Sequence, residues 1–179
     1  MLLRTPIALA AVAALAVGTP ALAAAPKPKP NTIETQGAAK IKINEYLQDG
    51  QKFVPGDITV KSGATVTLRN KSTDGAPHSL SLLAKSALPK TVAAVMQCPA
   101  CGPLLAAHQA DPNTGEVKVP LVDVGQPGFD TMGTKTTAGD SIFLPPKGKV
   151  TFKVTAKKGS KLTYFCAVHP WMQGTITVK

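Results

Sequence analysis

Short segments in which polar and apolar residues alternate constrain the fold of this chain more than any other sequence feature. Alternation with a period of two is typical of a strand that buries one face. It runs through residues 57–61, 64–70, 149–155 and 174–179, and shorter candidates lie at 41–43, 78–83, 141–144 and 161–166. Turn residues such as Pro55-Gly56 and Lys158-Gly159 keep these strands short. The pattern predicts an all-β fold, a sandwich or a barrel.

The middle of the chain departs from this pattern. Val92, Val95 and Met96 recur at helical spacing, and Leu104 and His108 do so further on. The stretch between them contains prolines, which predicts one or two short helices rather than a single long one. Residues 116–139 are irregular and rich in glycine. We therefore expect a partly helical insertion at about 84–140 within the β domain.

The first residues have the composition of an export signal. Arg4 precedes an apolar run at 7–17, and Ala21-Leu22-Ala23 is a small-x-small cleavage pattern. The run is too short to span a bilayer, so a cleaved signal peptide at 1–23 is favoured over a retained membrane anchor. A Pro/Lys-rich linker is predicted at 24–38, which leaves 39–179 as the domain. We expect an exported protein, periplasmic, extracellular or at the cell surface, without a transmembrane segment after cleavage.

The chain is strongly basic, with a formal net charge of +10. Its lysines are scattered along turns and strands rather than gathered on one helix. Such a charge favours acidic partners or anionic surfaces through a general positive field. Nucleic acid is a possible partner for a basic chain, but export argues against it.

The segment between the last two predicted strands contains three potential metal ligands. Cys166, His169 and Met172 are spaced at i, i+3 and i+6, and Pro170 disfavours a helix there. In a loop between neighbouring strands, the three side chains can converge on one point. Thiolate, imidazole and thioether together select a soft or borderline metal, and a His₂Cys set with a weak axial Met is typical of blue copper. The second imidazole has to come from His78 or His108, and His78 opens a predicted strand.

These residues give the chain a resemblance to the cupredoxins, the plastocyanin- and azurin-like type 1 blue copper proteins. It rests on Pro77-His78 at the start of a strand and on residues 164–178, whose C-x2-H-x2-M spacing is similar to the short ligand loop of amicyanin. The resemblance implies a Greek-key β-sandwich that carries single electrons between redox partner proteins, which would dock through an acidic or apolar face. It implies one copper ion, Cu(I)/Cu(II), with the ligands His78, Cys166, His169 and Met172.

Two departures from the family pattern stand out. Ser79 follows the first histidine, where the family usually has an asparagine that ties the two ligand segments together, so we expect weaker or rearranged support there. His78 and Cys166 are also 88 positions apart. The insertion must therefore loop out, where it can cover the copper or dock a partner.

Cys98 and Cys101, in Met96-Gln97-Cys98-Pro99-Ala100-Cys101, allow three interpretations. Export favours a disulfide. A thioredoxin-like redox pair needs a βαβ context that the sequence lacks. A second Cu(I) site, with Met96 or His108 as further ligand, is chemically sound.

The resulting function is an electron carrier, with copper storage, buffering or delivery as the alternative. Multicopper enzymes need further histidine pairs, and the sequence has three histidines in total. A nucleophile elbow and a phosphate-binding glycine loop are also missing from the sequence. An enzyme is therefore not expected.

Overall fold

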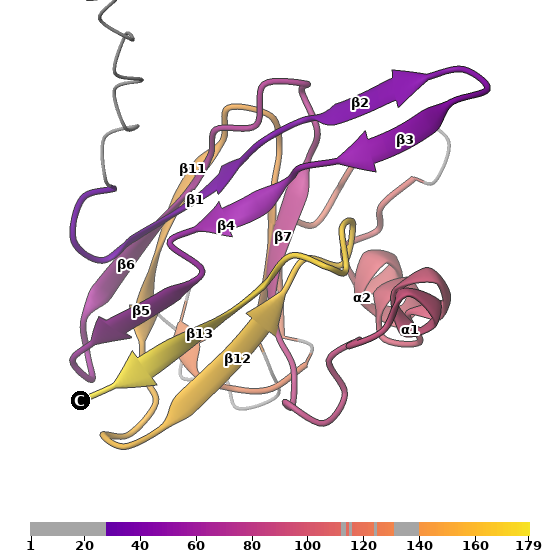
Figure 1. Cartoon of the computed structure of the whole chain (residues 1–179). Helices are drawn as coiled ribbons and strands as arrows, with labels where there is room; N and C mark the ends of the chain where they lie inside the picture. Colours follow the sequence, from indigo (N-terminus) through magenta and orange to yellow (C-terminus); the bar gives the residue numbers. More distant parts are fainter. Residues whose placement is uncertain (1–27, 112–113, 115, 124, 131–139) are drawn as a thin grey trace, which may run out of the picture.

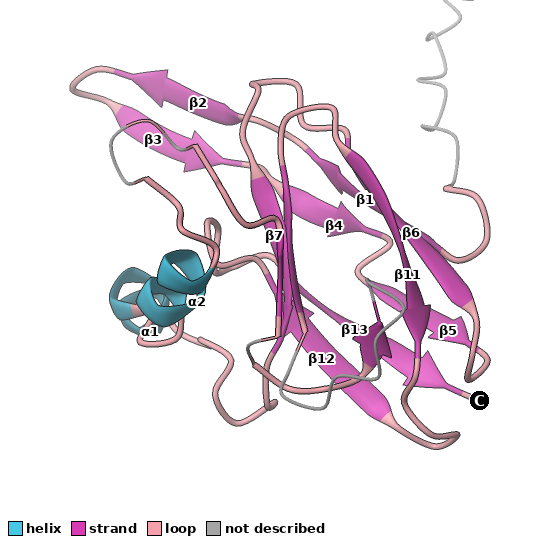
Figure 2. Cartoon of the chain, turned by 180° about the vertical axis from the view of Figure 1, so that it is seen from behind, coloured by secondary structure: helices cyan, strands magenta, loops and turns pink. Residues whose placement is uncertain are grey.

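The computed structural model describes residues 28–111, 114, 116–123, 125–130 and 140–179, so the predicted signal peptide lies outside the described residues. Two sheets face each other (Figures 1 and 2). One has the order β4 (Lys52–Val54), β1 (Thr32–Gln36), β6 (Thr65–Asn70), β11 (Lys149–Val154) and β9 (Phe129–Asp130). The other has the order β5 (Asp57–Val60), β13 (Gln173–Val178), β12 (Lys161–Phe165), β7 (His78–Leu82), β10 (Ser141–Leu144) and β8 (Leu121–Val122).

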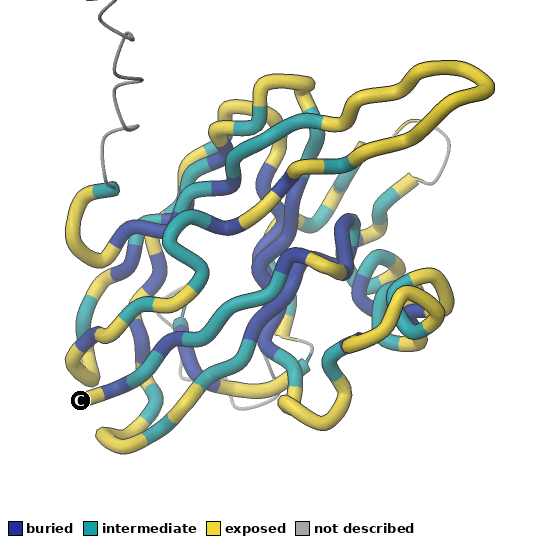
Figure 3. Tube along the Cα trace, in the orientation of Figure 1, coloured by how far each residue is buried: buried dark blue, intermediate teal, exposed yellow. Residues whose placement is uncertain are grey.

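The core lies between these two sheets. Alternate residues of β6 and β11, such as Leu68 and Phe152, pack against residues such as Leu80 and Ile176 from the other sheet. Figure 3 shows the buried stretches gathered on the facing strands. The apolar residues that alternate along the strands therefore form the faces through which the two sheets pack together. The predicted all-β sandwich is confirmed.

Each predicted strand segment overlaps a strand of the structure, and the ends agree to within two residues. The segment at 41–43 belongs to a separate two-stranded ribbon, β2 (Ala39–Lys42) paired with β3 (Tyr46–Asp49), which projects from the sandwich (Figure 1). Its apolar residues are exposed; Ile41, for example, retains 73% of its accessible surface. Alternation here does not mark a buried face.

The predicted linker boundary at residue 38 is wrong, because β1 lies before it. β1 pairs with β6 in parallel and with β4 in antiparallel orientation, and Ile33 is fully buried in the core. Thr35 is also fully buried, where its hydroxyl donates to Asn70 Oδ1 at 2.9 Å. A strand with one apolar residue and a buried polar contact leaves little hydrophobic pattern in the sequence, which explains the error. The domain begins by Thr32.

The insertion contains both predicted helical stretches, α1 (Val92–Gln97) and α2 (Cys101–Ala107). Thr91 caps α1, since its hydroxyl accepts from Ala94 N at 3.1 Å. The insertion also supplies β8 and β9, which extend β10 and β11. It is therefore integrated into both sheets as well as looped out beside them. Within the described ranges, the helices include none that could span a bilayer.

Candidate metal centre

The predicted ligand loop connects β12 to β13. Phe165 and Gln173 are register partners at the ends of these strands, so the chain between them reverses direction over 166–172. Two backbone hydrogen bonds hold the turn: Cys166 N donates to Met172 O at 3.0 Å, and Met172 N donates to His169 O at 2.8 Å. The loop is fixed at both ends and internally, which makes its side-chain directions well defined.

His78 reaches the same place from β7. This strand pairs antiparallel with β12, so it begins at the edge of the sheet where β12 ends. His78 is the first residue of β7, and Cys166 follows the last residue of β12. The sheet topology therefore brings His78 next to Cys166, although 88 positions separate them in the sequence.

The ligand atoms of His78, Cys166 and His169 all lie within 4.8 Å of one another, and the three residues are buried. Cys166 Sγ is 3.8 Å from Nδ1 of each histidine. A trigonal metal with bonds of about 2.3 Å to sulfur and about 2.05 Å to nitrogen separates these atoms by about 3.8 Å. The donor set therefore fits one metal ion bound through both Nδ1 atoms and the thiolate.

Met172 lies in the same loop and is 2% exposed. It belongs to the same buried cluster as Cys166. His108 is not part of this group, since Nδ1 lies 2.7 Å from Val119 O and Nε2 lies 2.8 Å from Ser141 Oγ. Of the two candidates for the second imidazole, the structure brings only His78 to the loop.

The outer nitrogens of the two histidines contact residues that the sequence did not single out. His78 Nε2 is 2.6 Å from Ser72 Oγ, and His169 Nε2 is 3.2 Å from Gln51 Nε2. The Gln51 amide also donates to Asp74 Oδ2 at 3.2 Å. Gln51 is 118 positions from His169, and no local sequence pattern connects them. Both imidazoles are thus oriented from the side opposite the thiol, as metal-bound histidines usually are.

Burial controls the protonation of the group. It lowers the pKa of His78 to about 4, with His169 acting in the same direction and Asp74 opposing it. Burial also lowers the pKa of His169, partly offset by Asp49 and Asp74. The pKa of the Cys166 thiol is raised by burial, against hydrogen bonds from Ser79 and the loop backbone. Both imidazoles are therefore neutral and able to ligate near pH 7, while the thiol keeps its proton until a metal displaces it.

Ser79, the departure from the family pattern, connects the two ligand segments. Its backbone N donates to Cys166 Sγ at 3.2 Å, and its hydroxyl accepts from Ala167 N at 2.7 Å. The support is thus rearranged: a serine side chain bridges β7 and the loop.

Cys98 and Cys101 form a disulfide. They lie at the end of α1 and the start of α2, and Cys98 packs in a cluster with Leu104, Phe165 and Ala167. Because Phe165 and Ala167 flank Cys166, the insertion packs directly against the ligand loop.

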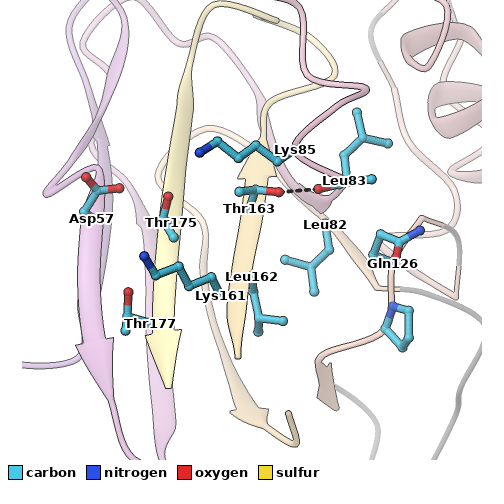
Figure 4. A pocket seen from close by; sticks show the side chains of 12 residues that line it. Asp57, Leu82, Leu83, Lys85, Gln126, Lys161, Leu162, Thr163, Thr175 and Thr177 are labelled. Atoms are coloured by element: carbon cyan, nitrogen blue, oxygen red, sulfur yellow. Dashed lines mark hydrogen bonds between the residues drawn. The ribbon is translucent and has the colours of Figure 1, made fainter. Parts of the chain in front are cut away.

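A surface hollow of about 430 Å³ lies elsewhere on the second sheet. Residues of β12, β13 and the segment after β7 line it, including Lys85, Lys161 and Thr163 (Figure 4). None of the grouped ligands lines this hollow, so it is separate from the candidate centre.

No family model matches the chain, and no curated protein matches its sequence. Among solved structures, a purple cupredoxin from Nitrosopumilus maritimus aligns at 17% identity over 83% of this chain and 98% of its own, with a TM-score of 0.40. A reduced auracyanin from Roseiflexus castenholzii aligns at 17% identity over 85% and 99%, also at 0.40. A reduced amicyanin mutant aligns at 14% identity over 85% and 86%, again at 0.40.

The chain has two facing sheets and a buried group of two histidines and one cysteine at their shared edge. In these two features, it resembles the cupredoxins.

Proposed function

We propose that this chain binds one copper ion as a type 1 site and carries single electrons between redox partners. The observation that supports this most directly is the buried Cys166 thiol, 3.8 Å from Nδ1 of His78 and from Nδ1 of His169. A trigonal His₂Cys set with a weak sulfur ligand is typical of such copper. Met172 is the proposed axial ligand.

The chain's contribution is a rigid, dry enclosure. Cys166 is fully buried, and the loop is held by its own backbone bonds and by β12 and β13. When bound, copper supplies the Cu(I)/Cu(II) couple. A site that keeps one geometry in both states needs little rearrangement when an electron arrives or leaves.

Electron exchange is proposed to pass through His169. This residue is 9% exposed, and the partly exposed Trp171 stands edge-on to it with ring centroids 5.3 Å apart. Trp171 Nε1 donates to the backbone O of Gln51 at 3.2 Å, and the Gln51 side chain contacts His169 Nε2. A redox partner with an acidic or apolar docking face suits this site on a basic protein.

Copper storage or delivery has less support. In the sequence, two cysteines near Met96 favoured that function, but Cys98 and Cys101 are joined as a disulfide and offer no thiolate while oxidised.

Export of the chain to the periplasm, cell surface or medium is part of the proposal. The disulfide agrees with it, because such bonds persist mainly in oxidising compartments.

The test is an absorption spectrum of the copper-loaded protein. We expect an intense visible thiolate-to-Cu(II) band at a stoichiometry of one copper per chain. Cys166→Ser should abolish it, whereas the matched pair Cys98→Ser/Cys101→Ser should keep it. A colourless Cu(II) form, or equal colour in the Cys166→Ser variant, would contradict the proposal.

A further inference from the structure

A chain of buried polar side chains leads from the candidate metal centre to His108 in the insertion. Ser79 Oγ is 3.1 Å from Ser81 Oγ, Ser81 Oγ is 2.6 Å from Ser141 Oγ, and Ser141 Oγ is 2.8 Å from His108 Nε2. All four side chains are at most 1% exposed. Buried polar groups are retained when they are hydrogen-bonded, and these four satisfy one another.

The fold brings them together on the outer face of the second sheet. Ser79 and Ser81 alternate along β7 with Leu80 and Leu82, which face the core. Ser141 is the direct cross-strand partner of Ser81. His108 follows α2 and approaches this face from the insertion, which explains why both faces of β7 are buried.

His108, at one end of this series of hydrogen-bonded side chains, fixes the direction of the hydrogen bonds. Val119 O can only accept, so His108 Nδ1, at 2.7 Å from it, carries the proton. Burial lowers the pKa of His108, which keeps the imidazole neutral and leaves Nε2 as an acceptor. Ser141 must then donate to His108, Ser81 to Ser141, and Ser79 to Ser81.

Ser79, at the other end of the series, lies beside the Cys166 sulfur. Ser79 Oγ accepts from Ala167 N, the residue after Cys166, and Ser79 N donates to Cys166 Sγ, so the hydroxyl lies beside the sulfur. The Ser79 proton thus has two possible acceptors, Ser81 Oγ and Cys166 Sγ. Because His108 sets the direction, the Ser79 hydroxyl proton points to Ser81. Ser79 then donates to the Cys166 sulfur only through its backbone N–H.

We propose that Ser79, Ser81, Ser141 and His108 form one oriented hydrogen-bonded chain that tunes the electron affinity of the Cys166 site by directing the Ser79 hydroxyl proton away from the sulfur. This inference rests on the proposed copper function. Hydrogen bonds to the cysteine sulfur are among the features that set the potential of such sites. His108 is then a positioning residue for a group that it does not touch.

The first test needs no metal. Nitrogen-15 NMR of the metal-free protein at neutral pH should show His108 as the neutral Nδ1–H tautomer. In Ser81→Ala the Ser79 hydroxyl loses its acceptor and turns toward Cys166, so the amide resonance of Ala167 should shift. A His108 imidazolium, an Nε2–H tautomer or an unmoved Ala167 resonance would overturn the inference, whether or not the protein binds copper.

The second test is the potential of the copper-loaded protein. Ser81→Ala frees the Ser79 proton to donate to the sulfur, which withdraws electron density and favours the reduced state. We expect the equilibrium constant for reduction to rise about threefold, roughly 28 mV at 59 mV per tenfold change. The matched control is Thr163→Val, which removes a hydroxyl that donates to Leu83 O on the same sheet (Figure 4).

A rescue pair separates orientation from packing. His108→Gln keeps an acceptor near the position of Nε2 and should leave the potential close to that of the parent. His108→Leu removes the acceptor and should raise the potential as Ser81→Ala does. Ser141→Ala interrupts the series at another position and should raise the potential as well. Equal shifts in Thr163→Val and Ser81→Ala, or in both His108 variants, would overturn the proposal.

Discussion

Cys166 illustrates how a single residue gains its role from position. It follows a strand, is completely buried, and stands between two imidazoles that come from different parts of the chain. A buried cysteine alone is most often a packing residue. Its proximity to two neutral imidazoles is what makes it the proposed ligand rather than a packing residue.

Met172 provides a prediction at the residue scale. Met172→Leu keeps volume and apolarity but removes the sulfur, so the fold and the visible band should persist. Loss of a weak electron donor should favour Cu(I), by about tenfold in the equilibrium constant for reduction, or roughly 60 mV. Cyclic voltammetry of the copper-loaded variant measures this. An unchanged potential would show that Met172 is not a ligand.

The sequence was informative for some site residues and silent for others. Cys166, His169 and Met172 lie within one loop, so their spacing alone indicates a metal site. Ser72 and Gln51 come from other segments, and each contacts an outer imidazole nitrogen. Contacts of this kind depend on how strands are stacked, which local patterns do not encode.

At the element scale, the disulfide between α1 and α2 makes a second prediction. It closes a loop of four residues, for which loss of chain entropy predicts about 2 kcal/mol of stabilisation. The Cys98→Ser/Cys101→Ser variant should therefore unfold at lower denaturant concentration, measured by urea titration. Its copper stoichiometry should remain at one. A stoichiometry below one would contradict this prediction.

β1 makes the third prediction, because it lies where the sequence indicated a linker. Ile33 is fully buried between the sheets, and Ile33→Ala should cost about 2–5 kcal/mol in the free energy of unfolding. Ile41→Ala is the matched control in the exposed ribbon and should change the same quantity by less than about 0.5 kcal/mol. Similar costs for both would mean that β1 is not part of the folded unit.

Predictable strands and missed strands differ in how their residues are buried. β6 alternates apolar and polar residues over its first five positions and β11 over all six, and both appear in the sequence as periodic segments. β8 and β9 are two residues long, and β1 buries a threonine through a hydrogen bond. Short edge strands and polar burial leave no period to detect.

At the scale of the whole molecule, the insertion and the sandwich form one unit. Leu104 of α2 packs with Phe165 and Ala167 beside Cys166, and His108 Nε2 is hydrogen-bonded to Ser141 on the outer sheet face. β8 and β9 extend both sheets. Much of the long separation between His78 and Cys166 is thus occupied by structure that packs against the sandwich beside the candidate centre.

The response of the whole fold to pH follows from its buried histidines. Burial lowers the pKa of His78 to about 4, and it lowers the pKa values of His108 and His169 as well. Between about 4 and their ordinary pKa near 6.5, the unfolded chain binds more protons than the folded one. The free energy of unfolding should therefore fall as pH decreases through this window. Asp140 acts in the opposite sense, because burial raises its pKa and the folded state then holds the extra proton.

We expect the histidines to dominate, since three act together, and the metal-free protein to lose on the order of 1–2 kcal/mol of stability between pH 6.5 and 4.5. Urea titrations across this range measure the slope. His78→Gln should make it shallower, because the glutamine does not titrate, whereas Asp140→Asn should make it steeper by removing the opposing group. Copper should steepen it further, since the metal competes with protons for both imidazoles and the thiol. A slope that His78→Gln leaves unchanged would mean that this imidazole is not protonated on unfolding, and that its burial does not control the pH response.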